Sequence, residues 1–236
     1  MNLVIDIGNT FVKLAVFQAG EIIYSSTEKD LTENTLVEVY EKFNIQNAIS
    51  SSVSSNNNVL KKYNILSLTH DTPLPLQLNY TTPQTLGLDR LAAVMGAKVK
   101  CDNNYLVIDM GTCVTFDYVN SNNEYLGGAI SPGFKMRFRS LNTFTKKLPL
   151  INYDDIKPKL VGDSTETSII SGVYNGLKNE ILGVINEYLQ QYNGVKIVVT
   201  GGDRNLFDLE PKNRIFADEF LVLRGLNEIL NYNEKK

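Results

Sequence analysis

The sequence is poor in the side chains that most often carry out nucleophilic chemistry. It has no tryptophan, a single histidine and two cysteines in 236 residues. His70 lies in a loop-like stretch, SLTHDTP, where a lone histidine is more often solvated than catalytic. Cys101 and Cys113 have neither metal-ligand spacing nor a histidine beside them. A Ser-His-Asp or Cys-His mechanism is therefore disfavoured, and we expect both cysteines to be reduced in a cytoplasmic protein.

Two further absences bear on partners. The formal net charge is −3, which argues against nucleic acid as the main partner. No apolar run approaches the roughly 20 residues of a membrane-spanning helix, and we expect no membrane association. The N-terminal LVIDIG is too short and too acidic for a signal peptide. The composition is that of a globular protein, with room for one large domain or two of about 100–120 residues.

One motif occurs twice in the chain. LVIDIG at residues 3–8 is echoed by LVIDMG at residues 106–111, and each copy leads into a β-rich run, a polar turn and a third short strand. Two unrelated strands ending in Asp-x-Gly are the simpler alternative, but the match extends beyond the motif. A repeat of about 100 residues is domain-sized. We therefore expect a duplicated domain, with the two copies at residues 1–100 and 101–236.

The remaining segments alternate between helical and strand patterns. Apolar residues recur every three to four positions in four segments, and two apolar runs of strand length lie between them. Such a mixture is typical of an α/β protein. The predicted helices span residues 32–43, 89–99, 165–192 and 218–230, and the predicted strands span residues 47–53 and 195–200.

The repeated acids indicate a particular chemistry. Asp6 and Asp109 each lie near the end of an apolar strand and are followed by small residues, whose amides can approach and cradle phosphate oxygens. Because a carboxylate repels phosphate, the two would need an intervening cation. Asp-x-Gly alone also forms ordinary turns, but here it is duplicated and accompanied by the strand-to-glycine turn at residues 200–202. The sequence has no Gly-x-x-x-x-Gly-Lys-Ser/Thr loop, so we do not expect a P-loop enzyme.

An ordered set of short stretches resembles the type III pantothenate kinases along essentially the whole chain. The resemblance implies an α/β fold of two duplicated ribonuclease-H-like, or actin-like, domains with a nucleotide cleft between them, as in the superfamily of acetate kinase, sugar kinases, heat-shock chaperone ATPases and actin. The stretches are DIGNT at 6–10, YTTP at 80–83, GLDR at 87–90, DMGT at 109–112, GGAISPG at 127–133, ST at 164–165 and TGG at 200–202.

The same resemblance implies an activity, cofactors and site residues. The activity is ATP-dependent phosphorylation of pantothenate to 4′-phosphopantothenate, the first step of coenzyme A biosynthesis, by a homodimer that uses Mg²⁺ and a monovalent cation, K⁺ or NH₄⁺. Asp89 would accept the proton of the pantothenate hydroxyl, and Asp109 would bind the monovalent cation. The implied ATP contacts are Asp6, Ile7, Gly8, Asn9, Thr10, Phe11, Val12, Lys13 and Thr112, and the implied pantothenate contacts are Tyr80, Gly87, Leu88, Asp89, Arg90 and Thr165.

Simpler roles stay open for several of these residues. Asp89 could be the N-cap of a helix, with Arg90 solvated. Tyr80 could pack a loop, and Thr165 could cap the helix that it begins. The glycine-rich stretch 127–133 could form only a tight turn.

Two other functions are also open for the whole chain. The first is a related sugar or hydroxy-acid kinase, although residues 87–90 suit a substrate that carries a carboxylate. The second is a non-catalytic nucleotide-binding regulator, against which the intact Asp6, Asp89 and Asp109 argue.

Overall fold

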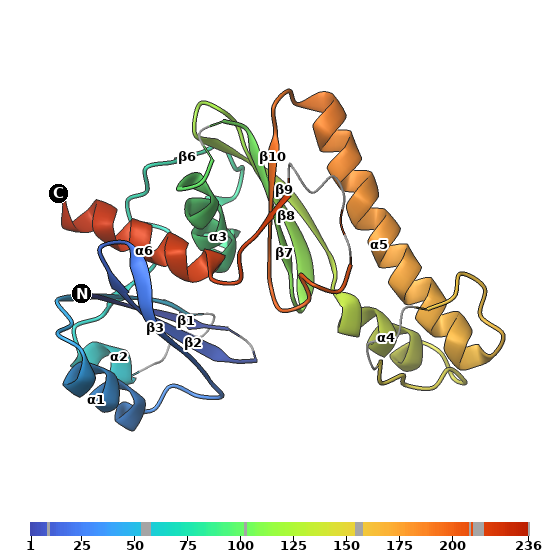
Figure 1. The fold of residues 1–236 in the computed structure, drawn as a ribbon, viewed down its shortest axis with the longest axis horizontal. Helices are drawn as coiled ribbons and strands as arrows, with labels where there is room; N and C mark the ends of the chain where they lie inside the picture. The colour runs from blue at the N-terminus through green and yellow to red at the C-terminus, as the bar shows by residue number, and fades with distance from the viewer. Residues whose placement is uncertain are drawn as a thin grey trace. The chain divides into compact units, whose positions relative to one another are not determined.

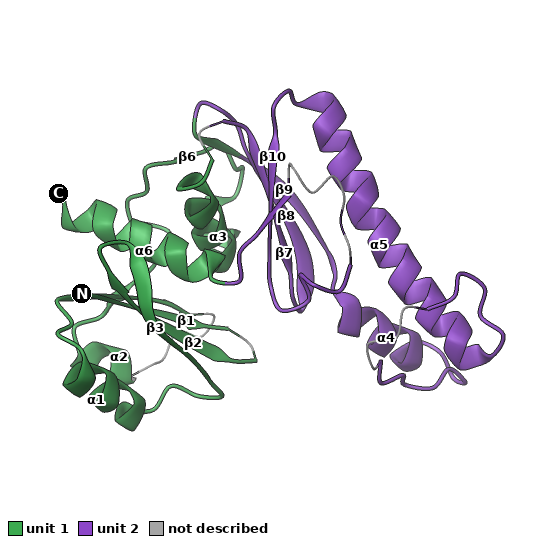
Figure 2. Cartoon of the chain, viewed as in Figure 1, with its two compact units in different colours: residues 1–102, 123–125, 220–236 green, residues 103–122, 126–219 purple. Residues whose placement is uncertain are grey.

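The computed structural model describes residues 1–8, 10–52, 58–101, 103–153, 158–207, 209 and 215–235 (Figure 1). The chain forms two compact units, which Figure 2 shows in different colours. Unit 1 contains residues 1–102, 123–125 and 220–236, and unit 2 contains residues 103–122 and 126–219. A domain boundary near residue 100 stays a prediction.

Unit 1 is built on a five-stranded mixed sheet with the strand order β3-β2-β1-β4-β5. The first three strands pair antiparallel, whereas β4 runs parallel to β1 and β5 runs parallel to β4. The strands are β1 (Asn2–Ile7), β2 (Val12–Gln18), β3 (Glu21–Glu28), β4 (Asn47–Ser52) and β5 (Leu66–Ser67).

Helices cover both faces of this sheet. Leu36 and Val39 of α1 (Glu33–Lys42) and Leu60 of α2 (Asn58–Lys62) share a core cluster with Leu3, Ile5 and Leu14 of the sheet. The helices α3 (Leu88–Lys98) and α6 (Leu221–Glu234) pack together, and α6 contacts β1, β2 and β4. Unit 1 also contains a 3₁₀ turn, η1 (Pro83–Thr85), and a short strand, β6 (Gln77–Leu78), which pairs with residues 124–125 at the start of β9.

The C-terminal helix therefore belongs to unit 1, although its sequence follows the second half of the chain. Glycines allow α3 and α6 to approach closely. A Cβ at Gly96 would lie 2.1 Å from the Leu221 carbonyl oxygen, and one at Gly225 would lie 1.7 Å from that of Ala92. Only glycine fits such a backbone-to-backbone contact.

Unit 2 repeats the arrangement of unit 1. Its strands have the order β11-β10-β7-β8-β9, with β7 and β8 antiparallel and β10 parallel to both β7 and β11. The strands are β7 (Tyr105–Met110), β8 (Cys113–Val119), β9 (Glu124–Pro132), β10 (Lys196–Thr200) and β11 (Ile215–Ala217), and the helices are α4 (Phe134–Thr143) and α5 (Thr165–Gln191).

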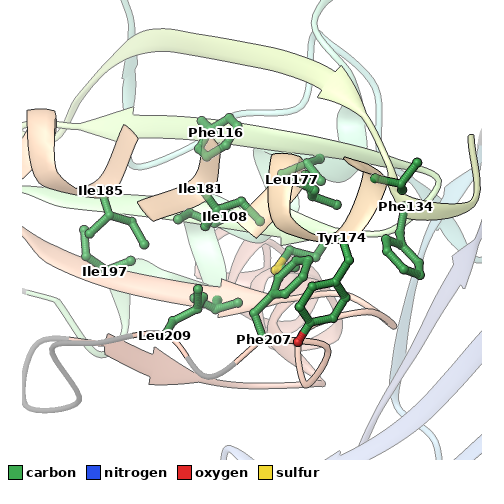
Figure 3. Packing of buried hydrophobic residues seen from close by; sticks show 14 of the residues in the cluster. Ile108, Phe116, Phe134, Tyr174, Leu177, Ile181, Ile185, Ile197, Phe207 and Leu209 are labelled. Carbon is green, nitrogen blue, oxygen red and sulfur yellow. The ribbon is translucent and has the colours of Figure 1, made fainter. Parts of the chain in front are cut away.

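The long helix α5 supplies much of the core of unit 2. Its residues Leu177, Ile181 and Ile185 belong to one buried cluster with Ile108 of β7 and Phe116 of β8 (Figure 3). No helix in the described ranges is both long and apolar enough to cross a lipid bilayer.

The predicted duplication is confirmed, because the first four strands of each repeat have the same order in the sheet, β3-β2-β1-β4 in unit 1 and β9-β8-β7-β10 in unit 2. One of the simpler alternatives is excluded. Residues 127–133 do not form a tight turn, because β9 continues to Pro132. Gly128 lies inside this strand, where a Cβ would come within 1.6 Å of the Phe116 carbonyl oxygen. The glycines thus mark a close backbone approach within a sheet and not a chain reversal.

Candidate active site

Asp6 occupies the end of β1 on the sheet face opposite the cluster of Leu3 and Ile5. The strand register places Lys13 of β2 on one side of it and Ser51 of β4 on the other. Burial raises the pKa of Asp6 to about 6; the Lys13 ammonium opposes this rise, and the Asp89 carboxylate adds to it. Two carboxylates and one ammonium group of unit 1 therefore lie within electrostatic reach of one another.

The turn after Asp6 connects β1 to β2. Ile7 and Val12 pair across the hairpin, and both are buried, so they anchor the two ends of the turn to the core. The Gly8 amide donates a hydrogen bond to the Phe11 carbonyl at 3.1 Å. Thr10 is exposed and the Phe11 side chain is half-exposed, which leaves both beside solvent. Asn9, also predicted to contact ATP, lies outside the described residues.

Asp89 lies in the first turn of α3, but it is not the N-cap. That position belongs to Gly87, which makes no side-chain cap, and Leu88 is the first helical residue. The Asp89 carboxylate accepts a hydrogen bond from the Arg90 amide at 2.9 Å and is otherwise exposed. A Cβ at Gly87 would lie 2.4 Å from Asp89 Oδ1, so glycine leaves room for this carboxylate.

The simpler interpretation of this segment had Arg90 solvated, but the structure buries it. It is 7% exposed, on a helix whose following residues are buried throughout. A buried guanidinium needs polar partners. The GLDR stretch thus combines one exposed acid and one buried base at a helix start.

Two side chains support the approach to α3. The Tyr80 ring packs against Tyr125, with centroids 5.9 Å apart, so Tyr80 does pack in the structure. His70 Nε2 lies 2.8 Å from the Leu86 carbonyl and must donate to it, because a carbonyl only accepts. This contact ties the loop of His70 to the residue that precedes Gly87. Sequence reasoning missed it, because the two residues are joined only by tertiary structure.

In unit 2, Asp109 lies near the end of β7, in the place that Asp6 has in β1. The register places Thr115 of β8 and Thr200 of β10 beside it. Gly201 adopts φ +93°, and a Cβ there would lie 2.2 Å from the Met110 carbonyl oxygen and 2.5 Å from Asp109 Oδ1. The predicted glycine turn after β10 therefore lies directly against the acid.

The second hairpin, with its turn at residues 111–112, has three residues between its last paired positions, whereas the first hairpin has four. Met110 pairs with Val114, whereas Ile7 pairs with Val12. Thr112 is exposed, and its carbonyl accepts a hydrogen bond from the Gly133 amide at 3.1 Å. The turn is thus held by the residue at which β9 passes into α4.

Thr165 is the first residue of α5 and is exposed, but it does not cap the helix. Ser164 is the N-cap, in a reciprocal capping box with Thr167. Thr165 lines a cavity of about 690 Å³ between α4 and α5. The other lining residues are Arg137, Ser140, Leu141, Leu148, Ser168, Ile169, Gly172 and Val173.

The described residues contain no group of three or more His, Cys, Asp or Glu side chains that could hold a metal ion. Burial disfavours the charged form of Asp6 even with Lys13 beside it, and a cation bound at this carboxylate would offset that cost.

Solved structures indicate the class of protein that this fold defines. A glucokinase from an Antarctic psychrotroph matches with a TM-score of 0.52 at 12% identity, over 98% of each chain. A Campylobacter jejuni protein named for the Baf family of transcriptional activators matches with a TM-score of 0.61 at 23% identity, over 99% of this chain and 100% of the other. At such identities the likeness establishes the fold alone, which is the duplicated α/β fold expected from the sequence.

Sequence comparison gives the family within that class. The family model described as type III pantothenate kinase matches residues 2–187. A type III pantothenate kinase from Phocaeicola vulgatus is 43% identical over 242 residues and covers 100% of both chains. The chain belongs to the type III pantothenate kinase family, and the predicted resemblance is confirmed.

Proposed function

We propose that this protein transfers the γ-phosphoryl group of ATP to the hydroxyl of pantothenate, giving 4′-phosphopantothenate for coenzyme A biosynthesis. Family membership supports the reaction. The observation that carries the chemistry is the position of Asp89, whose exposed carboxylate stands at the start of α3 within electrostatic reach of Asp6. An acceptor for the substrate proton and an acid for the phosphate-bound cation would thus share one region of unit 1.

The roles divide among the described residues as follows. Asp89 accepts the hydroxyl proton and orients the oxygen, which is the main requirement when the transition state is loose. Arg90, Tyr80 and the Gly87–Leu88 backbone bind pantothenate, and Thr165 is a further pantothenate contact. The turn after Asp6 and the Lys13 ammonium bind the ATP phosphates, and Thr112 is a further ATP contact.

Two cations belong to the proposal. A divalent cation bound with ATP would neutralise phosphate charge, and Asp6 is the residue that we propose to hold it. We assign a monovalent cation, K⁺ or NH₄⁺, to Asp109. Support for this assignment comes from the partial burial of Asp109 and from the neighbouring Thr115 and Thr200, since hard cations favour oxygen ligands.

A homodimer in the cytoplasm completes the proposal. Several large apolar side chains of unit 2 are exposed around α4 and the segment before α5, and exposed apolar patches often mark protein interfaces. The fractions exposed are 85% for Phe144, 53% for Leu150, 79% for Leu160 and 77% for Val161. Sedimentation of the purified protein tests this assignment, and a monomer at micromolar concentration would contradict it.

A coupled ADP-release assay with ATP, Mg²⁺ and pantothenate, run in potassium and in sodium salts, tests the function. We expect turnover that requires pantothenate and rises with potassium. Omission of pantothenate measures background ATP hydrolysis, and a neutral sugar tests the related sugar-kinase activity. Absence of turnover in both salts, from protein shown to be folded, would contradict the proposal and favour a nucleotide-binding regulator.

A further inference from the structure

Arg137 of α4 joins three elements of unit 2 through one guanidinium group. Its Nη2 donates to Glu180 Oε2 of α5 at 2.6 Å and to Ser131 Oγ of β9 at 2.9 Å. Its Nε donates to the Pro132 carbonyl at 2.9 Å. The Arg137 and Glu180 side chains are only 21% and 31% exposed, so this ion pair is less screened than one on the open surface.

The strand end that Arg137 holds leads directly to the second turn. Gly133 follows Pro132 and donates its amide to the Thr112 carbonyl at 3.1 Å. A Cβ at Gly133 would lie 2.2 Å from the Gly111 carbonyl oxygen and 2.4 Å from that of Thr112. The junction of β9 and α4 therefore lies in contact with the turn, and a shift of one would move the other.

Unit 1 has no equivalent tether among the residues that the structure describes. There, β3 ends at Glu28, opposite Val12, and α1 begins after its cap, Thr32. Each turn closes on itself, through Gly8 to Phe11 in unit 1 and through Gly111 to Cys113 in unit 2, but no described backbone hydrogen bond joins the first turn to the start of α1. Among the described residues, the tether is thus found at the second hairpin and not at the first.

We propose that Arg137 is a positioning residue for nucleotide binding. Its three hydrogen bonds fix the β9–α4 junction, and the junction fixes the turn at residues 111–112 where Thr112 meets ATP. This inference rests on the proposed function, because it takes that turn as an ATP contact. A misplacement of about 1 Å at such a contact can cost on the order of 100-fold in rate.

The test compares four variants in the same assay, with kcat and both KM values measured. We expect Arg137→Ala to raise the KM for ATP by about 10-fold or more while changing the KM for pantothenate less than about 2-fold. Arg137→Lys keeps a positive charge for Glu180 but cannot make all three hydrogen bonds of the guanidinium group, and Glu180→Gln removes the ion pair. Both variants should therefore have a KM for ATP between those of wild type and Arg137→Ala. Arg139→Ala is the matched control, since Arg139 is an exposed arginine on the same helix.

Three outcomes would overturn the inference. The first is an Arg137→Ala protein that folds and has the wild-type KM for ATP. The second is a rise in the KM for pantothenate alone, which would assign Arg137 to the cavity that contains Thr165. The third, available even if Arg137→Ala does not fold, is a wild-type KM for ATP in both Arg137→Lys and Glu180→Gln.

Calorimetric titration of ATP into the same proteins separates this inference from the proposed function. If wild-type protein binds ATP but does not phosphorylate pantothenate, the proposed function fails. The affinities of the Arg137 variants for ATP would still decide the positioning role, with a loss of about 10-fold or more supporting it.

Discussion

The β1–β2 and β7–β8 hairpins, which contain Asp6 and Asp109, have the same fold and different surroundings. Asp6 has a lysine beside it and a second carboxylate within electrostatic reach, whereas Asp109 has two threonines beside it in the register and a glycine turn against it. Both turns close on themselves, through the Gly8 to Phe11 and the Gly111 to Cys113 hydrogen bonds, but the first has one residue more between its paired strands, and the second is also tethered to the β9–α4 junction. The two acids therefore share one scaffold, and our proposal assigns a different ion to each because their neighbours differ.

The largest expected effect distinguishes Asp89, the proposed proton acceptor, from Asp6 and Asp109. Asp89→Asn keeps the shape of the side chain but removes its basicity, so kcat should fall by about 10²–10⁴-fold with ATP affinity nearly unchanged. Steady-state kinetics and calorimetry measure the two quantities. Asp30→Asn, at an exposed position, controls for the loss of one negative charge. A variant with near wild-type turnover would reduce Asp89 to a structural role at the start of α3.

The second prediction concerns the glycine turn against Asp109. Gly201→Ala combines a positive φ with a Cβ pressed on the Met110 carbonyl, so we expect a loss of about 2–4 kcal/mol in the free energy of unfolding. Gly202→Ala is the control, because nothing lies within 4 Å of its Cβ. Urea unfolding of both variants measures the difference. Equal midpoints for the two would show that the turn relaxes away from Asp109.

The third prediction uses the raised pKa of Asp6. Between about pH 4 and pH 6 the folded state binds more protons at Asp6 than the unfolded state does, so Asp6 lowers the stability as the pH rises through this window. Asp6→Asn removes that cost. Without ATP and divalent cations, the variant should be more stable than wild type at pH 7, by at most about 3 kcal/mol, and equal to it below about pH 4.

Urea unfolding at several pH values measures this difference, and Asp30→Asn again serves as the control. A stability difference that does not change between pH 4 and pH 7 would contradict the assignment of the raised pKa to Asp6. A more stable variant that is also less active would be typical of an acid kept in place for function.

The smallest expected effect is at His70, which supports unit 1 from outside the site. His70→Ala removes one hydrogen bond to the Leu86 carbonyl, worth about 1 kcal/mol. We expect the KM for pantothenate to rise about 5-fold, with the KM for ATP unchanged. Asp71→Asn, at the exposed neighbouring residue, is the control. An unchanged KM for pantothenate would mean that the segment from Gly87 keeps its position without His70.

Local patterns in the sequence predicted most of the fold. The helix expected over residues 32–43 is α1 with its cap Thr32, and the segment expected over residues 165–192 is α5. The missed features depend on distant contacts. The end of β9 could not be recognised because Gly128 looks like a turn residue until the backbone of Phe116 is placed beside it. The packing of α6 on α3 likewise depends on glycines more than 100 residues apart.

The candidate site was predictable as a set of residues but not as an arrangement. The sequence stretches DIGNT, GLDR and DMGT contain Asp6, Asp89 and Asp109. The structure places Asp6 and Asp89 within electrostatic reach of each other in unit 1. Nothing in the local sequence reveals that Gly87, and not Asp89, takes the cap position, or that Arg137 reaches the strand before its own helix. Such facts depend on backbone geometry and on tertiary hydrogen bonds, which leave no periodic pattern in the sequence.

The most direct test of the difference between the two hairpins is a potassium titration of the Asp6→Asn and Asp109→Asn variants side by side. Turnover and the melting temperature with ATP bound are both recorded, so that an inactive variant still gives a result. The account predicts that Asp109→Asn loses the potassium response, whereas Asp6→Asn keeps it at a lower rate. If Asp109→Asn kept the wild-type potassium response, or if both variants lost it, the division of roles between the two acids would be wrong.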